Sequence, residues 1–257
     1  MKVTIVKIGG NLIENQDTLQ HFLDDFSAIQ GPKVLIHGGG KLATNLAETM
    51  GIPVHMVDGR RITDGETLKV ITMVYGGLVN KSIVAGLQAR SCNATGVSGA
   101  DLNLITSVKR PVKTHDFGFV GDVTAVDEKM LTLLLEHEIT PVCCAITHDG
   151  KGQLFNTNAD TIATEIAVAL SKQNETELYY CFEKKGVLKN INDEDSVIRT
   201  IDTESYEELK AAGIIADGML PKLHNCFDAL NRGVNKVYIG NIEMLRSKES
   251  IKTTITL

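Results

Sequence analysis

Residues 3–10 read VTIVKIGG, a short apolar run that carries one lysine and ends on a glycine pair. Residues 34–41, VLIHGGGK, repeat the pattern with three glycines. Apolar runs of this length that end on glycine are typical of buried strands running into tight turns. Between them, residues 16–29 place apolar side chains at helical spacing. The two runs therefore predict strands of one parallel sheet, joined by a helix.

The rest of the chain continues this alternation, with one exception. Segment 104–126 has short alternating runs with Pro111, Gly118 and Gly121, which predicts a β-hairpin region. Elsewhere the alternation predicts an α/β fold, a three-layer sandwich with a central, mostly parallel open β-sheet covered by helices on both faces. No linker or repeat interrupts it, so residues 1–257 are expected to form a single domain. Further helices are expected at 41–50, 63–89, 127–137, 159–171, 203–212 and 219–231, and further strands at 139–146, 178–182 and 235–239.

The composition argues against several classes of protein. A formal net charge of -6 argues against a general nucleic-acid binder, because affinity for the phosphate backbone needs clustered Lys and Arg. Basic dipeptides such as Lys109-Arg110 are interpreted as solvated surface. No apolar run approaches the ~18 to 20 residues of a bilayer span, so no membrane segment is expected. The five cysteines include no C-x-x-C pair, which favours thiols packed in the core of a cytoplasmic protein.

Glycine loops at strand ends indicate where the chemistry lies. In open α/β sheets, ligands bind beyond the carboxyl ends of the strands, and glycine lets backbone N–H groups approach an anion there. Three segments fit such a place, the last of them at a helix start: Lys7–Asn11, His37–Lys41 and Gly218–Lys222. A simple tight turn is the alternative for each loop taken alone. Two loops after successive strands together indicate a phosphoryl-binding site.

Common catalytic signatures are absent from the sequence. Neither G-x-x-x-x-G-K-[ST] nor a G-x-G-x-x-G fingerprint occurs, which weakens ordinary P-loop and Rossmann interpretations. The histidines form no H-E-x-x-H pair, and no G-x-S-x-G elbow is present. No metal ligands are therefore predicted. His37, before the three glycines, either touches a ligand or packs and hydrogen-bonds, and we favour the second role.

Seven short motifs occur in order along nearly the whole chain: Lys7–Gly10, His37–Gly40, Asp58–Asp64, Val79–Lys81, Phe119–Val123, Asn156–Asp160 and Gly218–Lys222. Together they resemble the acetylglutamate kinases of the amino acid kinase family. The first motif alone is shared by carbamate, aspartate and uridylate kinases, but the joint occurrence of all seven is specific.

The resemblance implies the amino acid kinase fold and an enzyme that moves the γ-phosphoryl group of ATP onto the γ-carboxylate of N-acetyl-L-glutamate, the second step of arginine biosynthesis. It also implies Mg²⁺, held through the nucleotide phosphates. A carboxylate acceptor, with a pKa of about 4.3, is ionised at neutral pH and needs no general base, in keeping with the lack of a His/Asp dyad. The same reaction on N-succinyl-L-glutamate is the alternative. Another member of the family, or a non-catalytic ligand sensor, is a further alternative.

The resemblance also assigns roles to residues. Lys7 and Lys222 would stabilise the transition state. Asp160 would orient both lysines, and the helix that begins near residue 160 would be capped by Asp160 or by Asn158. Arg61 would grip the substrate's α-carboxylate by a bidentate pair, whereas Arg60 is interpreted as surface. The other substrate-binding residues would be Gly38, Gly39, Gly40, Asn156 and Asn158, and the phosphate- and ATP-binding residues Gly9, Gly10, Glu183, Gly186, Asp217, Gly218 and Met219.

The nucleotide loop at residues 181–187 departs from the family's pattern. Glu183 stands where an Asp is customary and Phe182 where a small residue is, although Gly186 is retained. The family's contacts to adenine and phosphate therefore do not carry over directly to this loop.

The resemblance finally predicts lobes and an assembly. A lobe of about residues 1–174 would bind the acylated amino acid, and a lobe of about residues 175–257 would bind ATP. A homodimer is expected, and Gly76-Gly77 in the long helix is a candidate contact. Arginine-inhibited relatives carry a helix before the first strand, which begins here at about Lys2, so insensitivity to arginine is expected.

Overall fold

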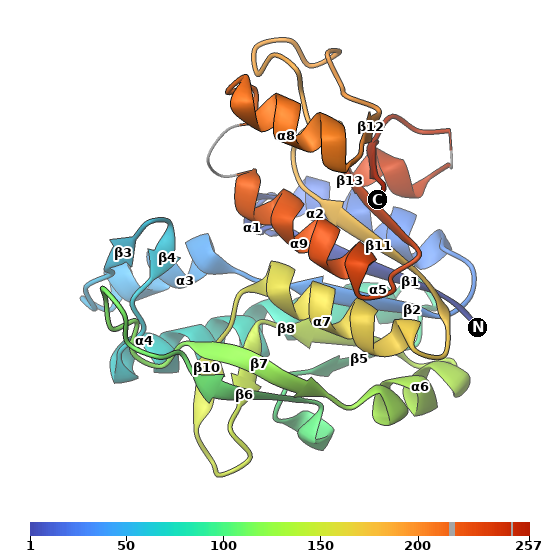
Figure 1. The fold of residues 1–257 in the computed structure, drawn as a ribbon. Helices are drawn as coiled ribbons and strands as arrows, with labels where there is room; N and C mark the ends of the chain where they lie inside the picture. Colours follow the sequence, from blue (N-terminus) through green and yellow to red (C-terminus); the bar gives the residue numbers. More distant parts are fainter. Residues whose placement is uncertain (216–218, 248) are drawn as a thin grey trace.

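A central sheet of eight strands forms the middle layer of the fold in the computed structural model, which describes residues 1–215, 219–247 and 249–257 (Figure 1). The strands follow the order β12-β14-β13-β11-β1-β2-β8-β5, and neighbours are parallel except β13 and β14. Their bounds are β1 Lys2–Ile8, β2 Lys33–His37, β5 Ala94–Val97, β8 Thr140–Cys144, β11 Glu175–Cys181, β12 Thr200–Ile201, β13 Lys236–Gly240 and β14 Thr253–Ile255.

Strand β1 lies in the interior of this sheet. Its valines and isoleucines are fully buried, as is typical of a parallel strand covered by helices on both faces. It pairs in parallel with β2 and β11, and Ile8 stands opposite both His37 and Cys181. The three carboxyl ends therefore meet at one edge of the sheet. The glycine loops that follow β1 and β2 lie at this edge, where open α/β sheets place their ligands.

Helices cover both faces of the sheet (Figure 1). Helices α7 and α9 lie in front in this view, and α2 and α5 lie behind. Helix α7 contacts β1, β2 and β11 on one side and β7 on the other, so it is apolar almost all round. The helices are α1 Gly10–Glu14, α2 Gln16–Ala28, α3 Gly40–Thr49, α4 Gly65–Ile71, α5 Asn80–Gln88, α6 Glu128–Glu136, α7 Ala159–Ser171, α8 Thr203–Ala211 and α9 Leu220–Asn231, with short 3₁₀ turns η2 Asp101–Asn103 and η3 Ile242–Leu245.

Two smaller sheets lie beside the main one. The first has the strand order β10-β9-β6-β7 and includes the antiparallel pair β6–β7 that the sequence predicts as a hairpin region. The second is an antiparallel ribbon of β3 and β4. Their bounds are β3 Met56–Val57, β4 Arg60–Arg61, β6 Ile105–Lys109, β7 Gly121–Val126, β9 Ile146–His148 and β10 Leu154–Asn156. Both sheets contribute residues to the cavity described below.

One long helix corrects an expectation. Helix α4, a π-helical segment η1 (Thr72–Val79) and α5 run on without a break over Gly65–Gln88. The helix has 24 residues and contains an 18-residue window with a mean hydropathy of 1.4, so it is long and apolar enough to cross a membrane by length and composition alone. The sequence-based expectation that no segment approaches this length was wrong. In the fold, the helix packs on β5, β8 and α2, so it is a core helix.

The predicted fold class is confirmed, since the sheet is mostly parallel and covered on both faces. Predicted helices and strands lie within a few residues of the observed ones. The segment predicted as one strand at 139–146 is divided, because the chain leaves the main sheet after β8 and enters the second sheet as β9. The edge strand β12 and its neighbour β14 were not predicted, because two or three residues are too few to show a pattern.

Candidate active site

Two lysines and one aspartate meet at the carboxyl edge of the sheet. Lys7, the last residue but one of β1, places its Nζ 2.7 Å from Oδ1 of Asp160, in the first turn of α7. Lys222, in the first turn of α9, places its Nζ 2.9 Å from Oδ2 of the same carboxylate. The side chains of Lys7, Lys222 and Asp160 are 12%, 15% and 18% exposed. We call these three residues the lysine–aspartate cluster.

The lysine–aspartate cluster carries an excess of positive charge, because two ammonium groups share one carboxylate. Burial would raise the pKa of Asp160, but the charges of Lys7 and then Lys222 outweigh burial and hold that pKa well below its usual range. Burial lowers the pKa of Lys7, and the attraction of Asp160 only partly offsets this effect. The charge of Lys222 lowers the pKa of Lys7 further. An additional anionic group beside the two lysines would therefore be stabilised.

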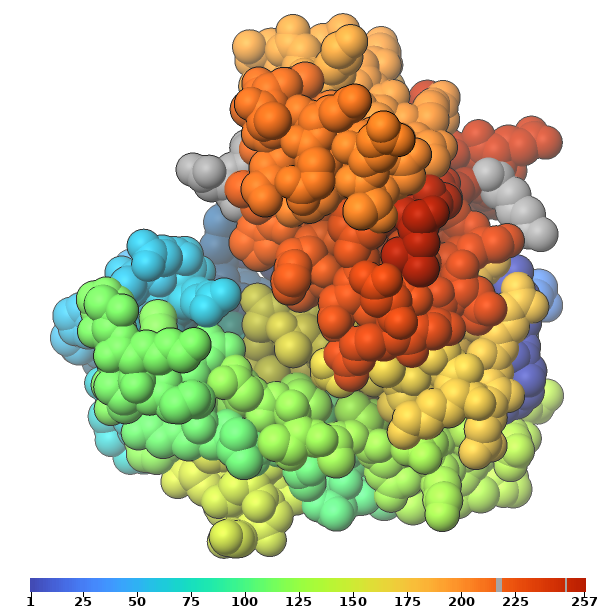
Figure 2. Space-filling view, in the orientation of Figure 1, coloured from blue at the N-terminus to red at the C-terminus, as the bar shows by residue number. Residues whose placement is uncertain are grey.

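A cavity of about 420 Å³ opens beside the cluster. Figure 2 shows the surface hollowed between the segment around residues 50–60 (cyan) and the C-terminal part of the chain (orange). Lys7 and Asp160 line the cavity. So do seven of the other predicted site residues, namely Gly10, Gly38, Gly39, Gly40, Arg61, Asn156 and Asn158. Residues predicted from separate motifs are thus brought to one place.

The two glycine loops differ in what they offer. Gly10 lines the cavity, but Gly9 does not, and its N–H donates to the carbonyl of Cys181 over 3.2 Å. The expected use of Gly9 as a free phosphate donor therefore needs correction, because the pairing of β1 with β11 continues one residue past the strand. In the second loop Gly39 has φ +151°, and a Cβ there would stand 3.1 Å from the ring of Tyr75. Glycine lets Tyr75 pack against this loop.

Arg61 lines the cavity from the β3–β4 ribbon and is held in place there. Its Nη2 donates to the carbonyl of Gly40 over 2.9 Å and to Oγ1 of Thr44 over 2.8 Å. These two bonds hold the guanidinium beside the second glycine loop. Neighbouring Arg60 is exposed, as expected, but it also lines the cavity. Two guanidinium groups that line a small cavity favour an anionic ligand with a carboxylate there.

Two asparagines just before α7 also line the cavity. Asn156, at the end of β10, donates from Nδ2 to Oγ1 of Thr63 over 3.0 Å. Asn158 caps α7, and its Oδ1 accepts from the N–H groups of Asp160 (2.8 Å) and Thr161 (3.1 Å). Of the two candidate caps, Asn158 takes this role, so the carboxylate of Asp160 is left to the two lysines.

His37 packs and hydrogen-bonds rather than facing the cavity. It is fully buried, its Nδ1 lies 2.8 Å from the carbonyl of Gly38, and its Nε2 lies 3.0 Å from Nδ2 of Asn80. Asn80 can only donate from Nδ2, so Nε2 accepts and Nδ1–H donates. Burial first, and then the charge of Lys81, lower the pKa of His37 to about 4. His37 is therefore neutral, and its hydrogen bond to Gly38 holds the start of the second glycine loop in place.

Glu183, Gly186 and Met219, three of the residues predicted to bind the nucleotide, do not line the cavity. Glu183 is exposed, and Met219 packs half-buried against the core. A Cβ at Gly186 would stand 2.6 Å from Oγ1 of Thr253, so close packing alone explains this glycine. The predicted residues Asp217 and Gly218 lie outside the described residues. Among the described residues, the cavity therefore gathers the acid and phosphoryl parts of the predicted site but none of Glu183, Gly186 and Met219.

No group of three or more His, Cys, Asp or Glu side chains that could hold a metal ion occurs within residues 1–215, 219–247 and 249–257. Asp160 is the one carboxylate among the described residues that line the cavity, and both of its oxygens contact lysines. The donor set therefore does not fit a metal site built by the chain itself.

Tyr75 and Arg110 are among the cavity residues that were not predicted from the sequence. Tyr75, from the π-helical segment, reaches the cavity with its ring beside Gly39. Arg110, interpreted as surface, also lines the cavity; Asp122 accepts from its Nε over 2.9 Å and from its Nη2 over 2.7 Å. The guanidinium lies 5.9 Å from the ring centre of Phe117. An arginine with this support is more ordered than an ordinary surface arginine.

Comparison with known proteins agrees with this geometry. The sequence matches the amino acid kinase family over residues 2–241. It is 58% identical over 238 residues to an acetylglutamate kinase from Phocaeicola vulgatus, with 93% of each chain covered. It is 55% identical over 251 residues to an acetylglutamate kinase from Bacteroides thetaiotaomicron, with 98% of each chain covered. Carbamate kinase from Giardia lamblia bound to AMP-PNP has the same fold, with a TM-score of 0.74 at 13% identity, and 99% of this chain and 98% of that chain are covered.

Proposed function

The chain belongs to the amino acid kinase family, and on this basis we propose that it transfers the γ-phosphoryl group of ATP to the γ-carboxylate of N-acetyl-L-glutamate. One observation carries the proposal: Lys7 and Asp160 of the lysine–aspartate cluster line the same cavity as Arg61. The site thus offers cations for a phosphoryl group and a guanidinium for a carboxylate. The product, an acyl phosphate, belongs to arginine biosynthesis.

The reaction needs positioned charge more than proton transfer. A γ-carboxylate oxygen bonds to the γ-phosphorus while the bond to the β–γ bridging oxygen breaks and ADP leaves. Negative charge on the equatorial phosphoryl oxygens is met by Lys7 and Lys222, which Asp160 holds at fixed places. The acceptor is already ionised at neutral pH, so no base is needed. Arg61 binds the α-carboxylate and keeps the acid in line.

Nucleotide and metal belong to the other half of the proposal. The acid-binding residues precede residue 175, and we assign ATP to the lobe of about residues 175–257, from which Lys222 reaches Asp160. Mg²⁺ would arrive as a complex with the nucleotide phosphates and would neutralise part of their charge, since the described cavity residues leave it no free carboxylate. All five cysteines are free and buried, which suits a cytoplasmic enzyme.

N-succinyl-L-glutamate is a second candidate acid, and one observation favours it. Arg110 lines the cavity that holds Arg61, and Asp122 and Phe117 hold its guanidinium in place. An acetyl group ends in a methyl, which needs no cation, whereas a succinyl group ends in a carboxylate that arginine binds well. Arg110 would then recognise the acyl group.

Trapping of the acyl phosphate with hydroxylamine tests the proposal. Purified protein, ATP and Mg²⁺ are incubated with N-acetyl-L-glutamate or with N-succinyl-L-glutamate, and the hydroxamate is measured. We expect product from the acetylated acid. Faster turnover of the succinylated acid would give preference to the second candidate. Hydroxamate from neither acid would overturn the proposed function.

The pKa of Lys7 gives a pH dependence. Since this pKa is lowered from 10.5, Lys7 loses its charge at a lower pH than a free lysine does. The value of kcat/KM reports the free enzyme, so it should fall as the pH rises through the lowered pKa of Lys7. The measurement is kcat/KM between about pH 7 and about pH 10.5, with circular dichroism at each pH to show that the protein stays folded. A flat profile up to the upper limit in folded protein would contradict the account.

We also propose a homodimer formed through the long helix. Between Lys69 and Lys81 the helix has no charged residue, and it exposes 48% of Met73 and 61% of Leu78. No atom lies within 4 Å of a Cβ built on Gly77, so this face is open to a second copy. Exposed apolar side chains beside small residues favour a two-fold contact.

Leu78→Glu should therefore convert a dimer to a monomer, because a charge at the centre of an apolar contact is costly to bury. Light scattering measures the mass, and Leu133→Glu, at an exposed leucine of α6, is the matched control that should stay dimeric. A monomeric wild type, or a dimer that survives Leu78→Glu, would exclude this contact.

A further inference from the structure

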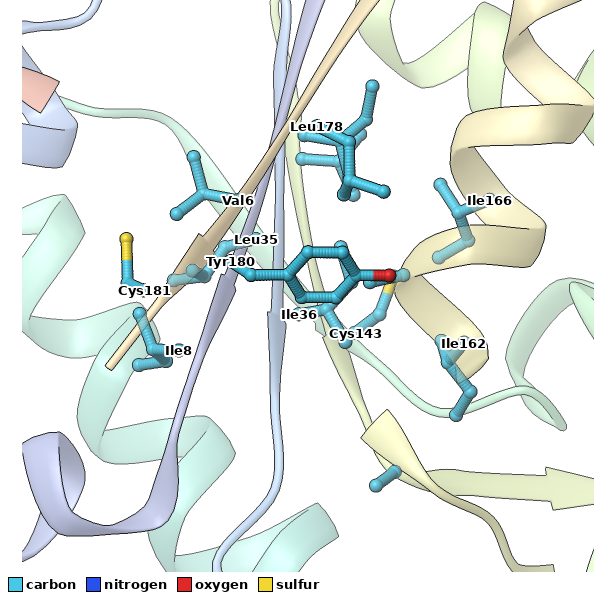
Figure 3. Packing of buried hydrophobic residues seen from close by; sticks show 14 of the residues in the cluster. Val6, Ile8, Leu35, Ile36, Cys143, Ile162, Ile166, Leu178, Tyr180 and Cys181 are labelled. Carbon is cyan, nitrogen blue, oxygen red and sulfur yellow. The ribbon is translucent and has the colours of Figure 1, made fainter. Parts of the chain in front are cut away.

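Tyr180 lies in the core directly beneath the lysine–aspartate cluster. It stands on β11, beside β1, and is 1% exposed. Figure 3 shows its ring among apolar side chains of neighbouring strands, with the hydroxyl pointing toward the helix that carries Ile162 and Ile166. That helix is α7, which also carries Asp160. A buried tyrosine keeps its hydroxyl in the core only where partners satisfy it.

The hydroxyl is tied to the turn of α7 that carries Asp160. Tyr180 Oη lies 3.2 Å from the backbone carbonyl of Asp160 and 2.7 Å from Oγ1 of Thr164. Thr164 Oγ1 lies 3.1 Å from the same carbonyl. The two hydroxyl groups have two protons for these three contacts. Either Tyr180 donates to the carbonyl and Thr164 donates to Tyr180, or Thr164 donates to the carbonyl and Tyr180 donates to Thr164. In either arrangement the ring of Tyr180 is anchored to the backbone of Asp160.

The face of the same ring supports Lys222. Its Nζ lies 5.4 Å from the ring centre of Tyr180 and 2.9 Å from Oδ2 of Asp160. Lysine has a flexible side chain, and a single contact leaves its ammonium free to swing. The carboxylate and the ring together hold the ammonium from two directions, because the negative face of an aromatic ring attracts a cation.

We propose that Tyr180 is a positioning residue for phosphoryl transfer: its ring holds the ammonium of Lys222 and its hydroxyl, with Thr164, holds the backbone of Asp160. This inference rests on the proposed function, in which Lys222 stabilises the transition state. Tyr180 touches neither ATP nor the acid. From β11, it keeps Asp160 of α7 and Lys222 of α9 in fixed positions relative to each other.

Two substitutions separate the ring from the hydroxyl. Tyr180→Leu removes the ring and is expected to lower kcat by about 5- to 30-fold. Tyr180→Phe keeps the ring and removes the hydroxyl, with an expected loss of about 2- to 5-fold, since Thr164 can still donate to the carbonyl. In both, the KM for the acid should stay within about twofold, because Arg61 is untouched. A merely structural role predicts lower thermal stability with unchanged kcat of the folded enzyme.

Tyr179→Leu is the matched control. Tyr179 precedes Tyr180 on β11, so its side chain points to the opposite face of the sheet. Its hydroxyl donates to Glu177 over 3.1 Å, and its ring packs on Tyr238 at 4.7 Å between ring centres. This substitution removes a ring from the same strand without touching the lysine–aspartate cluster. Its kcat should therefore match that of the wild type.

Lysine labelling gives a readout that does not depend on turnover. The folded proteins are labelled with trace acetic anhydride, and mass spectrometry compares Lys222 with Lys41, whose side chain is 63% exposed. Without the ring, the Lys222 amine reaches solvent more often, so Tyr180→Leu should raise its relative labelling about threefold or more. Tyr180→Phe and Tyr179→Leu should label as the wild type does.

The two failures are distinguishable. Unchanged Lys222 labelling in Tyr180→Leu, or an unchanged kcat in folded protein, would overturn the positioning role. If Tyr180→Leu does not fold, Tyr180→Phe decides, and a kcat equal to that of the wild type would overturn the hydroxyl's part. A wild type that turns over neither acid would overturn the proposed function alone, and the labelling would still test the contact between Tyr180 and Lys222.

Discussion

Lys7→Ala is expected to lower kcat by about 10²- to 10³-fold or more and to change the KM for the acid less than about threefold. The reason is that, in the proposed reaction, Lys7 meets charge that develops on the phosphoryl group, while Arg61 would bind the α-carboxylate of the acid. Loss of Lys7 also leaves the Asp160 carboxylate paired with Lys222 alone. The charges of these two groups then cancel, and no excess positive charge is left for the phosphoryl group. Steady-state kinetics of ADP release measures both constants.

Lys41→Ala is the control for Lys7→Ala. Lys41 follows the second glycine loop, its side chain is 63% exposed, and it pairs with Glu14 over 3.4 Å. It does not line the cavity. Its removal should leave kcat within about twofold, since exposed ion pairs contribute little. If Lys7→Ala kept more than about a tenth of kcat, Lys7 would not be a principal source of transition-state stabilisation.

Arg61→Gln should act on binding instead of on the chemical step. We expect the KM for the acid to rise by about 10- to 150-fold with kcat changed much less, because a charged hydrogen-bonded pair contributes about 1.5–3 kcal/mol in ground state and transition state alike. Gly40 and Thr44 already fix the guanidinium, so little ordering is left to be done on binding. Initial rates over a range of acid concentrations give both constants.

Arg60→Gln is the matched comparison for Arg61→Gln. Arg60 is adjacent and carries the same charge, but it is exposed, and its side chain forms no hydrogen bond or ion pair with the described residues. Its removal should change the KM by less than about threefold. Equal effects of the two substitutions would mean that general positive charge at the cavity mouth, rather than a fixed pair with Arg61, binds the acid.

In the proposed reaction, the lysine–aspartate cluster would favour an anionic transition state. Two cations and one carboxylate are removed from most of the solvent, and the excess positive charge is already in place before the reaction begins. Burial weakens the hold of Lys7 on its proton, as the lowered pKa indicates. An incoming phosphoryl group would offset that cost. The two lysines are therefore expected to be more stable in their charged form with an anionic ligand bound than without one.

Much of this site could be predicted from the sequence because its parts lie at strand ends and helix starts. Lys7 precedes a glycine pair at the end of an apolar run, and Asp160 follows the capping residue Asn158. Such positions converge wherever parallel strands end at a common edge. Strand–helix alternation therefore predicted the layers, and it predicted the edge of the sheet at which the lysine–aspartate cluster and the cavity lie.

The remaining residues depend on contacts between segments far apart in the sequence. Tyr75 repeats the apolar pattern of a core helix, and only its packing beside Gly39 shows that it reaches the cavity. Arg110 reads as a surface residue, because its partner Asp122 lies across a hairpin. Gly9 and Gly186 read as ligand-binding glycines, but backbone pairing and the close approach of Thr253 explain them.

The path of a single oxygen atom tests the central claim most directly. N-acetyl-L-glutamate labelled with ¹⁸O in its γ-carboxylate is incubated with the enzyme, ATP, Mg²⁺ and hydroxylamine, and the phosphate formed is examined by ³¹P NMR. Hydroxylamine attacks the acyl carbon, so the bridging oxygen leaves with phosphate. If the γ-carboxylate attacks the γ-phosphorus, the phosphate carries one ¹⁸O from the acid. Phosphate without ¹⁸O would show that water, and not the carboxylate, accepts the phosphoryl group, and would contradict the account.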